Sequence, residues 1–167
     1  MGATGWNYFT PYQADIETAL QKLRAEVFER GEYGQAGGMS PEALASLPPE
    51  VRKAFENLRE LEAKRLGEPS EYGSIDELLE AAAEDGTHSI LDIQSTGSDP
   101  DFGVARPAPS DVVRQLYGSE HPSRAQIEAR AGEISEVLEL ERWQAVYVLV
   151  YDKGSPAEIY FEGVSGD

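Results

Sequence analysis

Cysteine is absent from the sequence, and histidine and methionine each occur only twice. Without thiols the chain forms no disulfide, no thiolate zinc site, no iron–sulfur cluster and no cysteine nucleophile. A chain that uses no disulfides is typical of a reducing compartment, so we expect a cytoplasmic protein. We also expect no cofactor.

Long apolar segments are lacking as well. The longest apolar run covers residues 145–151, whereas a membrane-spanning helix needs roughly 20 residues. No basic segment followed by an apolar stretch opens the sequence, which is the pattern of a secretion signal. The sequence therefore predicts neither membrane insertion nor secretion.

Basic residues are scarce: 14 Lys and Arg oppose 31 Asp and Glu, giving a formal net charge of −17. Such a charge repels nucleic-acid phosphates and anionic membranes, so direct binding to either is disfavoured. The imbalance is greatest between Leu66 and Ala105, where no Lys or Arg occurs. The acidic residues of this stretch are Glu68, Glu71, Asp76, Glu77, Glu80, Glu84, Asp85, Asp92, Asp99 and Asp101. Acidic surfaces commonly serve solubility alone, and a basic partner is the alternative.

The sequence lacks a P-loop, a Gly-x-Gly-x-x-Gly motif, a His-Glu-x-x-His motif and a Gly-x-Ser-x-Gly motif. His88, Ser89 and Asp92 do supply the residue types of a base, a hydroxyl nucleophile and an orienting carboxylate. Neighbouring side chains on a strand point to opposite faces, however, which separates His88 from Ser89. An acyl-transfer triad is therefore disfavoured.

Metal binding by His88, Asp92, Asp99, Asp101 and His121 is a second candidate chemistry. Carboxylates bind magnesium or calcium, but these residues lack the spacing of a calcium-binding hand. Aspartates in a Ser-Asp-Pro-Asp segment more often bond to their own backbone in turns. We predict no metal site.

Glu158 and Glu162 form a third candidate, because their even spacing on a strand places them on one face, where two carboxylates can do acid–base work. Charges on an edge strand, which prevent pairing with other chains, explain the same pattern. We favour the edge-strand interpretation.

The chain is expected to fold around one packed core, because it has 167 residues, 40% of them hydrophobic, and is rich in tyrosine. We predict one acidic α+β domain over residues 1–167. Helices are expected to begin at Asp15, Ser40, Pro49, Ser74, Ser110 and Ser123, with the last continuing through Gly132 to Leu138; strands are expected at 4–11 and 88–93, and a long polar loop at 95–109.

The clearest pattern is a C-terminal β-hairpin. Residues 145–151 and 158–162 are rich in strand-forming side chains and flank a turn containing Lys153 and Gly154. Val146, Val148 and Val150 are expected on one face of the first arm. The fold class that follows is α+β, with a small, largely antiparallel sheet covered by several helices.

The opening of the chain is aromatic. Trp6, Tyr8, Phe9 and Tyr12 are either core residues, packed on Leu20, Leu23 and the hairpin, or interface anchors; we favour the core for most of them.

Gly5-Trp-Asn-Tyr-Phe-Thr-Pro-Tyr-Gln-Ala-Asp-Ile16, followed by Leu20, Leu23, Val27 and Phe28, resembles the opening of a family of small uncharacterised bacterial proteins. Residues 86–92, Gly-Thr-His-Ser-Ile-Leu-Asp, are similar to the middle segment of that family. The resemblance implies a bacterial, cytoplasmic setting and no activity.

Charge and missing motifs together lead to the hypothesis of a small acidic interaction protein. It would occupy a basic surface of a partner protein, in the manner of an immunity protein, an antitoxin or a nucleic-acid mimic. The residues expected to bind the partner are Glu77, Glu80, Glu84, Asp85, Asp99 and Asp101. The alternative is a hydrolase, either metal-dependent or metal-free, centred on the His88 to Asp101 region. A third reading is a pocket for a small molecule beneath the glycine-rich segment 34–38.

Overall fold

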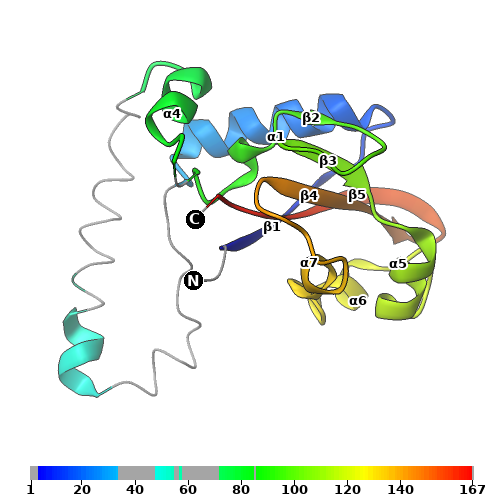
Figure 1. Cartoon of the computed structure of the whole chain (residues 1–167). Coiled ribbons are helices and arrows are strands. Elements are labelled where there is room, and N and C mark those ends of the chain that lie inside the picture. Colours follow the sequence, from blue (N-terminus) through cyan, green and yellow to red (C-terminus); the bar gives the residue numbers. More distant parts are fainter. Residues whose placement is uncertain (1–3, 34–47, 55–56, 58–71, 85, 167) are drawn as a thin grey trace.

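A mixed five-stranded sheet lies between helices that cover both of its faces (Figure 1). The structure is a computed structural model that describes residues 4–33, 48–54, 57, 72–84 and 86–166. Its elements are β1 (Gly5–Pro11), α1 (Ile16–Arg30), α4 (Ile75–Ala81), the 3₁₀ helix η1 (Ile90–Asp92), β2 (Ser95–Thr96), β3 (Val104–Pro107), α5 (Ser110–Tyr117), α6 (Arg124–Glu128), α7 (Glu133–Val137), β4 (Gln144–Asp152) and β5 (Ser155–Val164). The predicted α+β class is confirmed.

The predicted hairpin is confirmed as β4 and β5, which pair antiparallel with Leu149 opposite Ile159. Its turn is Lys153-Gly154, and both residues have positive φ, 49° and 81°. Two consecutive positive φ angles are those of a type I′ turn, whose twist matches that of the flanking strands.

The sheet has the order β1-β5-β4-β3-β2. The long strand β5 pairs antiparallel with both β1 and β4, whereas β3 pairs parallel with β4 and with the short β2. The prediction of one long polar loop over 95–109 was therefore wrong in part, because β2 and β3 lie within this span. Val104 and Ala105 form a strand because they pair with Gln144 and Ala145, forty residues further along the chain.

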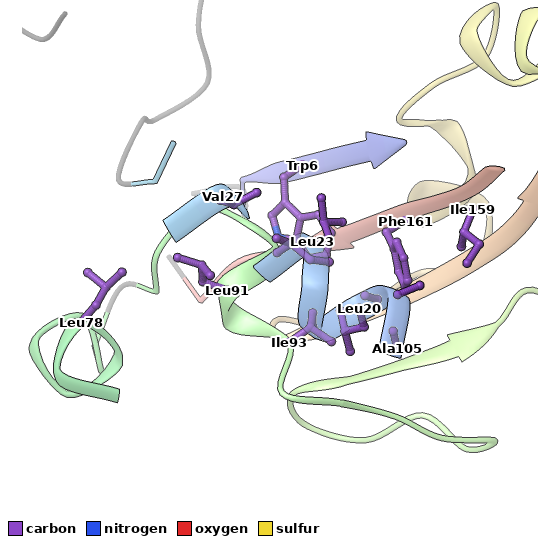
Figure 2. Packing of buried hydrophobic residues seen from close by; sticks show 13 residues of the cluster. Trp6, Leu20, Leu23, Val27, Leu78, Leu91, Ile93, Ala105, Ile159 and Phe161 are labelled. Carbon is purple, nitrogen blue, oxygen red and sulfur yellow. The ribbon is translucent and has the colours of Figure 1, made fainter. Parts of the chain in front are cut away.

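One face of the sheet is covered by α1, with η1 and α4 at its end. Figure 2 shows Leu23 and Val27 of α1 near Trp6 of β1, with Leu20 of the same cluster further along the helix. Trp6, Leu20 and Leu23 are all nearly or fully buried, which confirms the core role predicted for Trp6. Tyr12, by contrast, is 37% exposed.

The other face is covered by α5, α6 and α7, which form the crossover between the parallel strands β3 and β4. Val146, Val148 and Val150 point into this layer together with Tyr160 and Ile127. The alternation predicted for the hairpin is confirmed, because Ala145, Tyr147 and Leu149 belong to the opposite layer.

Two local predictions were wrong. Residues 90–92 form a 3₁₀ helix and not a strand, because the Ser89 side chain caps its first turn by accepting from the Leu91 amide. The helix from Ser123 ends at Glu128 and a second begins at Glu133. Gly132 between them has φ 89°, in the left-handed region that interrupts a right-handed helix.

Most predicted helix starts are confirmed. Asp15 and Ser74 accept hydrogen bonds from backbone amides at the starts of α1 and α4, and Ser123 forms a complete capping box with Gln126. Helix α5 begins at Ser110, but Pro109 occupies the N-cap position without a side-chain bond. Residues 49–54 are helical; the rest of that predicted helix to 66, apart from residue 57, and the one at 40–46 lie outside the described residues.

In the part of the chain described, no helix has both the length and the apolar character needed to cross a membrane.

We predict that replacing Ile159 by Ala lowers the free energy of unfolding by roughly 2–5 kcal/mol, the range for deleting a fully buried aliphatic side chain. Ile159 has no exposed surface. Leu149→Ala should cost less, because Leu149 is only partly buried, and Val137→Ala, at a position 53% exposed, should cost under about 0.5 kcal/mol. Urea unfolding of the three variants checks this order; an Ile159 loss as small as that at Val137 would contradict the described core.

Candidate functional site

The acidic residues predicted to bind a partner come from two segments. Glu77 and Glu80 lie on α4 and Glu84 follows it, while Asp99 and Asp101 lie in the connection between β2 and β3. All five are exposed. Asp85 lies outside the described residues.

The two acid-bearing segments meet at Trp143. The Phe102 ring, beside Asp101, lies with its centroid 5.2 Å from that of Trp143. The same Trp143 ring packs on Gly86, two residues after Glu84, where an added Cβ would come within 3.0 Å of it. Sequence reasoning missed this junction, because Gly86, Phe102 and Trp143 are brought together only by the fold.

Glu77 has a structural task in addition to its charge. Its carboxylate accepts a hydrogen bond from the Gly73 amide at 2.8 Å, while its own amide donates to the Ser74 hydroxyl. These bonds satisfy groups at the start of α4 that have no partner within the helix. Glu80 and Glu84 are therefore the cleaner probes of charge in this segment.

Asp92 is acidic but contributes nothing to the surface, because it is 1% exposed. Its carboxylate accepts from the amide and the hydroxyl of Thr87, at 2.7 and 2.8 Å, and from the hydroxyl of Ser165 at 2.9 Å. Three donors compensate the buried charge and fasten the chain end after β5 to the 87–92 turn. We call these residues the Asp92 lock.

The hydroxyl of Ser89 belongs to the same lock. It is fully buried, shares a hydrogen bond with the Thr87 hydroxyl at 2.7 Å, and accepts from the Leu91 amide. A nucleophile must reach substrate, and a base must reach the nucleophile. Buried and occupied as they are, Ser89 and Asp92 are arranged as a structural lock and not as a triad.

The metal candidates do not converge. His88 is in the left-handed region with φ 53°, and the His121 ring lies against Tyr151 with centroids 4.3 Å apart, beyond α5. Asp92 is buried, whereas Asp99 and Asp101 are exposed. Among the residues that the structure describes, no group of three His, Asp or Glu side chains is placed to hold a metal ion.

Glu158 and Glu162 lie on one face of β5, as predicted, but the edge-strand explanation was wrong because β5 is an interior strand between β1 and β4. Glu162 is 1% exposed and accepts from the Gly132 and Ser135 amides, at 2.9 and 2.8 Å, and from the Tyr160 hydroxyl. It thereby caps α7 from outside the helix. Glu158 instead binds Arg124 at 2.6 Å.

A pocket of about 370 Å³ lies beside Glu162, between the start of β1 and the end of α7. Glu136, Glu139 and Asn7 line it, so its polar wall is mostly acidic. The pocket predicted beneath residues 34–38 falls on residues outside the described ones. Nothing in the sequence pattern marks the pocket beside Glu162, because its walls come from three separate segments.

Burial raises the pKa of the Tyr147 phenol, and three further phenols are perturbed as well. Burial raises the pKa of Tyr8 to about 12, and the nearby Glu32 and Asp92 carboxylates add to this effect. Burial also raises the pKa values of Tyr117 and Tyr160, with further contributions from the negative charge of Glu162. All three phenols therefore remain neutral at physiological pH.

Comparison of the chain with protein-family models, curated proteins and solved structures finds no match. The resemblance to a bacterial family therefore stays a prediction, and function has to be argued from the residues themselves.

We predict that Asp92→Ala destabilises the fold by at least about 1–3 kcal/mol, because it leaves the buried donors of Thr87 and Ser165 without an acceptor. His88→Asn should leave folding unchanged, because asparagine tolerates the left-handed backbone found at His88. Chemical unfolding measures both. A folded His88→Asn protein that loses its cellular function would revive the hydrolase alternative, since that reading alone requires the imidazole.

From the raised pKa of Tyr8 we predict that the free energy of unfolding depends on pH in alkaline solution. An unfolded chain releases the Tyr8 proton near pH 10, whereas the folded protein holds it until about pH 12. The stability from the neutral phenol is fully present below pH 10 and is lost as pH rises through 12. Tyr8→Phe should therefore show a shallower fall in unfolding free energy between these values. Identical slopes in the variant and the original protein would contradict the assignment.

Proposed function

We propose that the protein is a small acidic interaction protein that binds a basic surface of a partner protein, as immunity proteins, antitoxins and nucleic-acid mimics do. The observation that carries the proposal is a set of four exposed acids on two segments whose Gly86 and Phe102 both lie against Trp143. We call these four acids, Glu80, Glu84, Asp99 and Asp101, the acidic face.

The four acids of the acidic face are not among the carboxylates that form the ion pairs described for this chain. The ion pairs at Arg30, Arg114, Arg124 and Arg130 engage glutamates elsewhere, on α1 and around α5 to α7. Exposed like charges raise the electrostatic energy of the folded chain slightly. A basic partner would relieve that repulsion, and its approach would be accelerated by the field of the acidic face.

The buried Asp92 lock favours this function over hydrolysis. The two side chains that would perform the chemistry, Ser89 and Asp92, are enclosed and bonded to Thr87, Leu91 and Ser165. The acids of the acidic face, by contrast, are exposed to solvent, as a docking surface requires.

The test compares two double variants that each remove two negative charges. Glu80→Gln/Glu84→Gln removes two charges from the acidic face, and Asp111→Asn/Asp152→Asn removes two charges at the start of α5 and the hairpin turn. A partner recovered with the unmodified protein is then mixed with each variant in a stopped-flow instrument. We expect the first variant to associate more slowly and with a weaker salt dependence, because rim charges act mainly on the association rate.

The control variant should associate like the original protein. If both variants retain the original association rate and salt slope, the acidic face does not steer the partner and the proposal fails. Equal slowing in both variants would also reject it, because the effect would then follow from net charge and not from this surface.

A further inference from the structure

The acidic face contains an exposed aromatic side chain. Phe102 is 61% exposed. It lies at the end of the β2–β3 connection, and the Asp101 carboxylate fixes its backbone by accepting from the Phe102 amide at 2.8 Å. Exposed aromatic side chains with a fixed position are characteristic anchors of protein interfaces.

Trp143 holds Phe102 in place from below. Its backbone has φ 67°, a conformation that side-chain-bearing residues adopt rarely, and its amide and carbonyl bond to Val164 and Gly103. Its ring fills the space over Gly86 and Gly166; an added Cβ on Gly166 would lie within 1.9 Å of the ring. The tryptophan is therefore a rigid support for the Phe102 ring, whose outer face remains open to solvent.

The charges around this aromatic pair are mostly negative. Asp99 and Asp101 precede Phe102, and Glu141 lies two residues before Trp143, with Arg142 as the one base in these two short segments. All four charged side chains are exposed. An aromatic face bordered by carboxylates attracts a cation through both the ring quadrupole and the acids.

Elsewhere in this chain, an arginine is bound by an aromatic ring and carboxylates together. The Arg124 guanidinium lies 4.2 Å from the centroid of the Phe9 ring and binds the carboxylates of Glu128 and Glu158, at 2.7 and 2.6 Å. The combination of one aromatic face and two carboxylates therefore binds an arginine within this same protein.

We infer that Phe102, with Asp99 and Asp101, is the anchor point of the acidic face and takes an arginine side chain of the basic partner. The guanidinium would stack on the exposed Phe102 face and donate to the two carboxylates, as Arg124 does at Phe9. This inference rests on the proposed function and adds the residue type that the partner must present. Arginine suits the site better than lysine, because its planar head both stacks and binds carboxylates in a bidentate manner.

The test uses a short peptide in which arginine alternates with glycine, and the same peptide with citrulline in place of arginine. Citrulline keeps the shape and removes the charge. Isothermal titration at low and at physiological ionic strength should detect binding of the arginine peptide alone. Phe102→Ala should weaken that binding by about 2- to 30-fold, the range of a cation–π contact, and Phe102→Trp should preserve it.

Two further variants make the result specific. Phe102→Leu keeps an apolar side chain without a ring, so it should bind as weakly as Phe102→Ala. Val137→Ala removes part of another exposed apolar side chain, on α7, and should bind like the original protein. Circular dichroism confirms that each variant is folded.

The outcomes separate the two proposals. If the original protein binds the arginine peptide with a salt dependence and Phe102→Ala or Phe102→Leu binds equally well, the anchor is rejected while the acidic face stands. If the peptide does not bind but Glu80→Gln/Glu84→Gln slows the recovered partner, the arginine anchor alone is rejected. If neither effect is seen, both proposals fail.

Discussion

Both layers of this protein depend on the pairing of β4 with β5. These strands carry apolar side chains on both faces, so the hairpin cannot remain at a surface and must be covered twice. Ile159 and Phe161 of β5 pack under α1, while Tyr160 between them packs under the crossover helices. Strands β1 and β3 then join the two sides of the hairpin. The sheet is consequently mixed, because β1 arrives antiparallel and β3 returns through a helical crossover to lie parallel.

Each helical layer is fastened to β5 or its end by one buried carboxylate. Asp92 binds Ser165, which directly follows β5, and Glu162 within β5 caps α7. Both carboxylates are satisfied by amides and hydroxyls and not by a cation. Buried charges with this many donors are compensated, and they also select one position for the layer they hold, because any displacement would leave the charge without its bonds. Two acids that look like catalytic candidates in the sequence are thus explained by the positions of the elements around them.

Local chemistry predicted a large part of the fold. The caps at Asp15, Ser74 and Ser123 and the alternation in residues 145–151 act over a few residues, and they correctly gave three helix starts and one strand, although the helix from Ser123 ends earlier than predicted. Strand β3 could not be predicted this way, because it exists through pairing with β4. The segment 88–93 was misread because its isoleucines are typical of strands, while the Ser89 cap favours a helical turn. At the candidate site, exposure of the acids followed from their charge, but the meeting of Gly86, Phe102 and Trp143 is a long-range contact with no local signal.

Charge and shape contribute differently to an acidic face of this kind. At physiological ionic strength the Debye length is about 8 Å, so the carboxylates on α4 attract any basic surface only at close approach, and they distinguish poorly among such surfaces. Selection has to come from groups that lose water on contact, where an incorrect partner leaves a charge or a ring without a match. Phe102, which lies against Trp143 and whose amide donates to Asp101, is the part of the face with a fixed shape as well as a charge. In the proposed complex, a field from α4 that speeds the last stage of encounter, together with a rigid aromatic contact that slows dissociation, would supply both the rate and the specificity that net charge alone lacks.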